Sequence, residues 1–184
     1  MKTTRIPDKV TSPIRRLCNR ICVGSVAEFV PVEPEPDGKL SDCFAIVDDK
    51  IKRMGGSVCH GWVVWLLPSI MVEGEFHAVW RSPDGELLDV SPNPLDAGHI
   101  LFIADPTRSY EGKQVDNIRI PLSKNPLVSE FIKLAHQSFL VMNEGDLAYQ
   151  VGAVAVDGRK LMPIQRRMQE LAHELQIGMG VTTR

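Results

Sequence analysis

The sequence has no long hydrophobic run, no strong net charge and no apolar segment near its start. Its longest apolar run, residues 62–67, ends at Pro68 and is far too short to cross a bilayer. Residues 1–7 contain no apolar h-region, so we expect no secretory signal. A formal net charge of −2 gives no reason to expect nucleic acid or an anionic membrane as a partner. These absences predict a cytoplasmic protein that binds neither nucleic acid nor a membrane.

Cysteine is scarce as well, with four residues and no Cys-x2-Cys pair among them. In a reducing cytosol we expect all four to remain thiols rather than form disulfides. Cys18 and Cys22 lie four residues apart on a predicted helix, and two further zinc ligands could come from Cys43, Cys59 and His60. Because Cys18 and Cys22 continue the apolar stripe of their helix, buried structural thiols are favoured instead. We therefore expect no metal and no other cofactor.

The length of 184 residues, the 43% hydrophobic content and the lack of repeats predict a single α+β domain covering residues 1–184. Its core motif spans residues 41–94, and residues 125–178 form a helical C-terminal part. Apolar periodicity and the positions of Gly and Pro predict the individual elements. Helices are expected to begin at Ser12, Ser41, Asn125 and Pro163, and strands to cover residues 27–32, 58–67, 75–81, 86–91, 100–104 and 115–121.

Cys43 is the candidate nucleophile. With Ser41 as the N-cap, Cys43 falls in the first turn of the second helix, where free backbone N–H groups and the helix dipole stabilise a thiolate. Such a position can lower the pKa of a cysteine from about 8.5 towards roughly 3.5–7.5. Since Cys43 follows a polar loop and precedes the apolar stripe, we expect it at an exposed helix mouth rather than in the core.

A predicted hairpin supplies a histidine and an aspartate. If Pro83-Asp84-Gly85 form a three-residue turn with Gly85 left-handed, Ser82 lies opposite Glu86. Side chains alternate between the two faces of a sheet, so this register places His77 and Asp89 on one face as diagonal neighbours. The register also gathers apolar side chains on the opposite face, namely Phe76, Ala78, Trp80, Leu88 and Val90.

These three residues make a chemically coherent set. His77 would take the thiol proton of Cys43 and later protonate the leaving group, and Asp89 would fix the tautomer and orientation of the ring. An alternative pairs Cys59 with His77. Cys59 lies on a predicted strand and lacks a helix N-terminus to ionise it, so Cys43 is the preferred nucleophile.

The segments that carry these residues resemble the transglutaminase-like branch of the papain-like cysteine hydrolases. The resemblance rests on residues 43–47 (CFAIV), 76–80 (FHAVW) and 88–92 (LDVSP), together with the intervening Gly55-Gly56, Gly61-Trp62 and Asp84-Gly85. The same pattern is similar to uncharacterised bacterial and phage proteins. It departs from the family in the order of Val79 and Trp80 and in the lack of a glutamine before Cys43, so the oxyanion would rely on the Cys43 backbone N–H and an unidentified second donor.

The resemblance implies a papain-like core, with an N-terminal catalytic helix packed on an antiparallel sheet and further helices after it. It also implies that Cys43 is the nucleophile, His77 the base and Asp89 the orienting acid. The expected function is that of a cysteine-dependent hydrolase or acyltransferase acting on an amide or ester of a protein, peptide or small molecule. Peptidase, amidase, deamidase and transglutaminase chemistry all fit. The alternative is an inactive papain-like fold that serves as a protein-interaction module.

Overall fold

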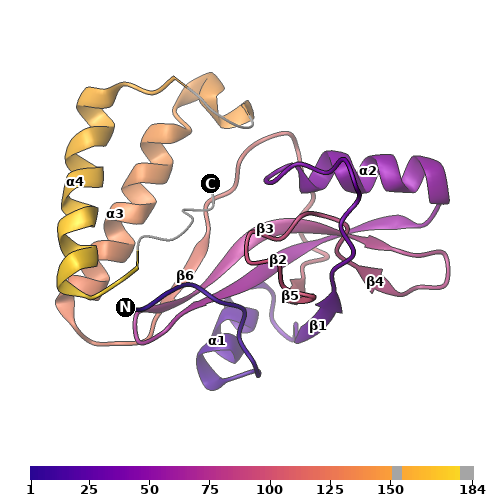
Figure 1. The fold of residues 1–184 in the computed structure, drawn as a ribbon, viewed down its shortest axis with the longest axis horizontal. Helices are drawn as coiled ribbons and strands as arrows, with labels where there is room; N and C mark the ends of the chain where they lie inside the picture. The colour runs from indigo at the N-terminus through magenta and orange to yellow at the C-terminus, as the bar shows by residue number, and fades with distance from the viewer. Residues whose placement is uncertain (151–154, 179–184) are drawn as a thin grey trace.

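The computed structural model describes residues 1–150 and 155–178, which form an α+β fold built on one antiparallel sheet (Figure 1). The strands come mainly from the first two thirds of the chain, and the last two long helices follow them. In chain order the elements are α1 Ser12–Ile21, β1 Ala27–Pro31, α2 Cys43–Met54, β2 Ser57–Leu67, β3 Met71–Arg81, β4 Leu87–Leu88, β5 His99–Ala104, β6 Ile118–Pro121, α3 Pro126–Met142, the 3-10 helix η1 Gly145–Tyr149 and α4 Gly158–Glu174.

The sheet is organised around the long hairpin of β2 and β3. Its strands are rich in β-branched and aromatic residues, which suit a pleated, half-buried surface. The strand order is β1-β5-β2-β3-β4, and β6 also pairs with β3. On the outer edge of β3, β6 pairs with residues 71–74 and β4 with residues 80–81. Within the described residues, segment 75–79 therefore has β2 as its only strand partner, and His77 lies in this gap.

The two ends of the strand order meet at Asp89, so the sheet is nearly closed. Val32, just after β1, forms a parallel bridge with Asp89, just after β4. The backbone N–H of Asp89 donates to the Pro31 carbonyl oxygen at 2.9 Å, and the Glu33 N–H donates to the Asp89 carbonyl oxygen at 2.9 Å. The backbone of Asp89 is thus fixed by both edges of the sheet.

The predicted turn between β3 and β4 is confirmed. The Ser82 N–H donates to the Glu86 carbonyl oxygen at 2.8 Å, Gly85 is left-handed with φ of +92°, and Trp80 pairs with Leu88. The predicted strand 86–91 is too long, because from Asp89 onwards the chain leaves β3 and bonds to the segment after β1. The hairpin register holds, but the closing of the sheet ends the strand.

Two predicted helix starts are wrong. Asp42, not Ser41, occupies the N-cap of α2, since Ser41 has a φ of +65° and belongs to the turn before the cap. The last helix begins at Gly158 rather than Pro163, because the Asp157 side chain accepts a hydrogen bond from the Arg159 N–H and caps the helix there. Pro163 lies inside the helix.

The helices pack against different parts of the sheet. From α1, the side chains of Ile14, Leu17 and Cys18 are buried in the largest apolar cluster of the sheet, and burial raises the pKa of the Cys18 thiol. Helix α2 packs against Ala78 and Trp80 of β3. Helices α3 and α4 pack on each other and on the β2–β3 turn, away from α2 (Figure 1).

Within the described ranges, none of the helices combines the length and the apolar character that crossing a bilayer requires.

Candidate active site

Cys43 is the first residue of α2, as the sequence predicts, but it is not exposed. Only 7% of its surface is accessible, because the first turn of α2 packs in a cluster with Ala78 and Val90. The expectation of an exposed helix mouth is therefore wrong. Access to Cys43 comes through a pocket that it lines together with His77 and Asp89.

His77 and Asp89 are in direct contact, as the hairpin register predicts. The Nε2 atom of His77 lies 3.1 Å from Oδ1 of Asp89. The same Oδ1 atom accepts a hydrogen bond from the Ser91 N–H at 3.0 Å, and only 3% of Asp89 is exposed. These two contacts, together with the backbone hydrogen bonds of Asp89 to the segment after β1, thus hold the Asp89 carboxylate in one orientation.

The Cys43 side chain also lies close enough to His77 to act on the pKa of the ring. Since Nε2 faces Asp89, Nδ1 is the ring nitrogen available to the thiol. Burial alone would lower the pKa of His77. The charges of Cys43 and Asp89, and the hydrogen bond to Asp89, outweigh burial and raise the pKa of His77 well above its ordinary value. A raised pKa favours the protonated ring beside the sulfur.

The raised pKa of His77 predicts a pH-dependent contribution to stability. An unfolded histidine titrates near 6.5, so the folded protein binds this proton more tightly than the unfolded chain does. The stabilisation is fully present below about pH 6.5 and is lost as the pH rises through the folded pKa. We expect the difference in free energy of unfolding between wild type and His77→Gln, measured by urea titration, to shrink from pH 6 towards pH 9.

His99→Gln is the control for that measurement, because His99 is an exposed histidine on β5. The difference in free energy of unfolding between wild type and His99→Gln should vary less with pH than the difference between wild type and His77→Gln. A difference between wild type and His77→Gln that stays constant across the range would contradict the raised pKa.

The pocket over these residues has a volume of about 460 Å³, which lies in the range of small-molecule sites. Val63, Trp65 and Ile100 from the central strands give it apolar walls. Ser91 also lines it, and the Ser91 hydroxyl is buried with no hydrogen-bond partner among the described residues. A buried hydroxyl without a partner is costly, so a ligand group that bonds to it would be favoured.

Tyr110 completes the pocket, and no pattern in the sequence marks it. It lies in the irregular segment between β5 and β6, where no periodicity marks a functional residue. Its ring stacks on Phe44 with centroids 3.7 Å apart and planes 4° apart, and its N–H donates to Nε2 of His60 at 3.4 Å. Burial, then the charges of Cys43 and Asp42, raise the pKa of Tyr110, so its hydroxyl is a donor at neutral pH.

The structure places the other candidate residues elsewhere. Cys59 lies opposite Val79 on the β2–β3 ladder, and its sulfur accepts a hydrogen bond from Nη2 of Arg81 at 3.5 Å. In the described part of the chain, no hydrogen bond joins Cys59 to His77. Across residues 1–150 and 155–178, no three His, Cys, Asp or Glu side chains gather as a metal site, so Cys18 and Cys22 do not meet further ligands there.

Comparisons of the chain with protein-family models, with curated proteins and with solved structures find no match in any of the three. The function must therefore be argued from the geometry of the site.

Proposed function

We propose that the protein is a cysteine-dependent hydrolase or acyltransferase that acts on an amide or ester, with the transglutaminase-like arrangement of a papain-like fold. The observation that carries this proposal is the chain of contacts in the pocket. Asp89 holds one nitrogen of His77 at 3.1 Å, and Cys43 at the start of α2 lines the same pocket, close enough to His77 to raise the pKa of the ring. Nucleophile, base and orienting acid thus stand in the order that thiol catalysis needs.

The proposed reaction begins with attack of the Cys43 sulfur on the carbonyl carbon of the substrate. A carbon–sulfur bond forms and the carbonyl electrons move to its oxygen. When the tetrahedral intermediate collapses, the bond to the amine or alcohol breaks and His77 gives that leaving group a proton. Water or an amine then attacks the thioester while His77 accepts its proton, and the Cys43 thiolate is released.

Two groups are suited to stabilise the oxyanion. The backbone N–H of Cys43 lies in the first turn of α2, where N–H groups have no partner within the helix. The Tyr110 hydroxyl lines the same pocket and stays protonated at neutral pH. We assign Tyr110 the role of the second donor, a role that the sequence left open.

The remaining features fit a cytoplasmic enzyme that uses no cofactor. All four cysteines are free thiols, and thiol catalysis depends on a reduced sulfur. The proposed substrates are proteins, peptides or small amides, with no part for nucleic acid or a membrane.

A burst experiment with p-nitrophenyl acetate tests the proposal. Wild-type protein should release about one equivalent of p-nitrophenol rapidly and then turn over slowly, because acylation of a thiol precedes deacylation. Mass spectrometry of acid-quenched protein should find the acetyl group on Cys43. Addition of a primary amine during turnover would separate acyl transfer from hydrolysis.

Two variants serve as controls in the burst experiment. Cys43→Ala should lose the burst, and Cys59→Ala should keep it, since the Cys59 thiol bonds to Arg81 rather than to His77. Acetyl groups spread evenly over the four cysteines, or a burst that survives Cys43→Ala, would refute the assignment of Cys43.

A further inference from the structure

The pocket at Cys43 continues into a second compartment. The two share six lining residues, namely Ser41, Phe44, Glu75, Phe76, Tyr110 and Gln114. The second compartment lies beside α3 and α4 and has a volume of about 190 Å³. Because whole ligand sites usually measure roughly 300–1,000 Å³, this space suits one part of a ligand whose remainder lies in the first pocket.

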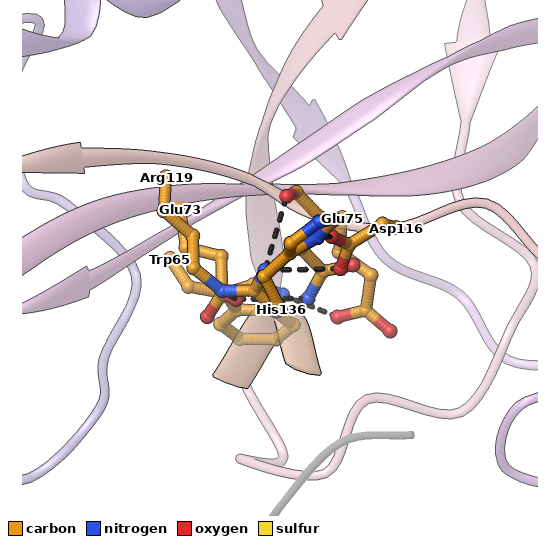
Figure 2. A network of polar contacts seen from close by, with 7 residues as sticks. Trp65, Glu73, Glu75, Asp116, Arg119 and His136 are labelled. Carbon is orange, nitrogen blue, oxygen red and sulfur yellow. Dashed lines mark hydrogen bonds and ion pairs between the residues drawn. The ribbon is translucent and has the colours of Figure 1, made fainter. Parts of the chain in front are cut away.

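A polar network forms one wall of the second compartment (Figure 2). The Arg119 guanidinium lies 2.8 Å from Glu73 and 2.9 Å from Asp116, and Asp116 also contacts Nδ1 of His136 on α3 at 2.5 Å. The Asn117 side chain donates to Glu73 at 3.0 Å. Since these contacts tie β3, β6 and α3 together, the wall is held in place without a ligand.

Another part of the network stands where the two compartments meet. The Trp65 Nε1–H donates to Oε2 of Glu75 at 2.6 Å, which fixes the Glu75 carboxylate at the junction (Figure 2). This bond links β2 to β3. The charged side chains of the network are therefore committed to structure, which leaves Lys113 and the other walls to set selectivity.

Those other walls are mainly apolar. Phe139 and Met142 of α3 and Met168 of α4 line the compartment. Methionine side chains are flexible and polarisable, so they adapt to apolar groups of different shape. The compartment thus favours an aliphatic or aromatic group.

The passage between the compartments has a different character. Ser41, Tyr110 and Gln114 place polar side chains along it. A peptide backbone carries both a donor and an acceptor in each unit and can bond to such groups, whereas a methylene chain would leave them without partners. The chemistry of the passage therefore favours a peptide over an alkyl chain.

We propose that this second compartment is a specificity subsite that binds a bulky apolar side chain of a peptide substrate whose reacting carbonyl lies at Cys43. The assignment rests on the proposed function and adds to it a substrate class. Substrates with leucine or phenylalanine at the matching position would be preferred over those with glycine.

Reactive peptides test the subsite without knowledge of the natural substrate. Chloroacetyl-Gly-X-amides and peptidyl chloromethyl ketones extend from their electrophile in opposite chain directions, and both can be made with X as glycine, leucine or phenylalanine. We expect kinact/KI at Cys43, followed by intact-protein mass, to be about tenfold or more higher for leucine and phenylalanine than for glycine in one direction. The kinact/KI of N-hexyl chloroacetamide should exceed that of N-methyl chloroacetamide by a smaller factor than that by which the leucine and phenylalanine peptides exceed the glycine peptide.

Filling the compartment should remove this preference. Ala135→Trp and Met142→Trp each place a large side chain at a lining position of α3, and either variant that keeps the wild-type melting temperature is usable. Within each variant, the rates for the leucine and phenylalanine peptides should fall to that of the glycine peptide. Leu140→Trp is the matched control, because Leu140 lies on the same helix and is 53% exposed. It should behave as wild type.

The outcomes separate the subsite from the proposed function. Equal rates for the three peptides in both directions, or a preference that survives filling, would overturn the subsite while Cys43 remains a nucleophile. If the hexyl probe exceeds the methyl probe in kinact/KI by as much as the phenylalanine peptide exceeds the glycine peptide, the assignment of a peptide is overturned in favour of an alkyl chain. Failure of every probe to react at Cys43 would overturn the proposed function itself.

Discussion

Replacing His77 by alanine should slow the alkylation of Cys43 by iodoacetamide at pH 6.5 about 10- to 100-fold. In wild type the pKa of His77 is raised, and a protonated ring beside the Cys43 sulfur favours the thiolate. Without an imidazolium, an ordinary thiol is about 1% ionised at this pH, and only the thiolate reacts. Labelling at each cysteine is measured by peptide mass spectrometry over time.

His136→Ala is the matched control for the labelling experiment. His136 also contacts a carboxylate, that of Asp116, but lies on α3 and outside the pocket at Cys43. The control should label at the wild-type rate. In wild type, Cys43 should react before Cys18, whose thiol is buried and has a raised pKa. Unchanged labelling of Cys43 in His77→Ala would show that the two side chains do not act together.

A second large effect is expected from Gly61→Ala, which should lower the free energy of unfolding by more than about 3 kcal/mol. Gly61 lies on β2, between His77 on β3 and Ala104 on β5. A Cβ atom there would come within 2.3 Å of the Ile103 carbonyl oxygen and within 2.3 Å of the Phe102 ring. Because the first contact is with backbone, the central strands would have to move apart.

Gly74→Ala provides the comparison, since it makes the same change on the neighbouring strand. Its added Cβ would meet Leu17 at 3.5 Å and Trp62 at 3.6 Å, which are ordinary contacts. We expect the free energy of unfolding to change by less than about 1 kcal/mol. Both variants are compared with wild type by urea titration of tryptophan fluorescence. Similar stabilities for the two variants would contradict the close strand packing at Gly61.

Much of the site could be predicted because its key information is local. The Asp84-Gly85 turn sets the hairpin register, and the register alone decides that His77 and Asp89 share a face. The position of Cys43 near a helix start follows from the polar loop before it and the apolar stripe after it. These inferences need only turn geometry and the two-residue period of a strand.

The rest depends on contacts between distant segments, which the sequence does not reveal. Burial of Cys43 follows from how α2 packs on β3. Tyr110 reaches the pocket from an irregular segment, and the second compartment exists because α3 docks beside β6. The start of α4 depends on the Asp157 cap, whereas Pro163, a residue type common at helix starts, lies inside the helix.

In the proposed enzyme, the meeting of the two sheet edges at Asp89 links chemical competence to the completion of folding. Residues 31–33 must reach Asp89 before its carboxylate has a fixed direction. A newly made chain that already contains its helix and hairpin would still lack an aligned imidazole. The Cys43 sulfur would therefore react little with carbonyl compounds of the cell while the chain is being made. Its reactivity would indicate that folding is complete.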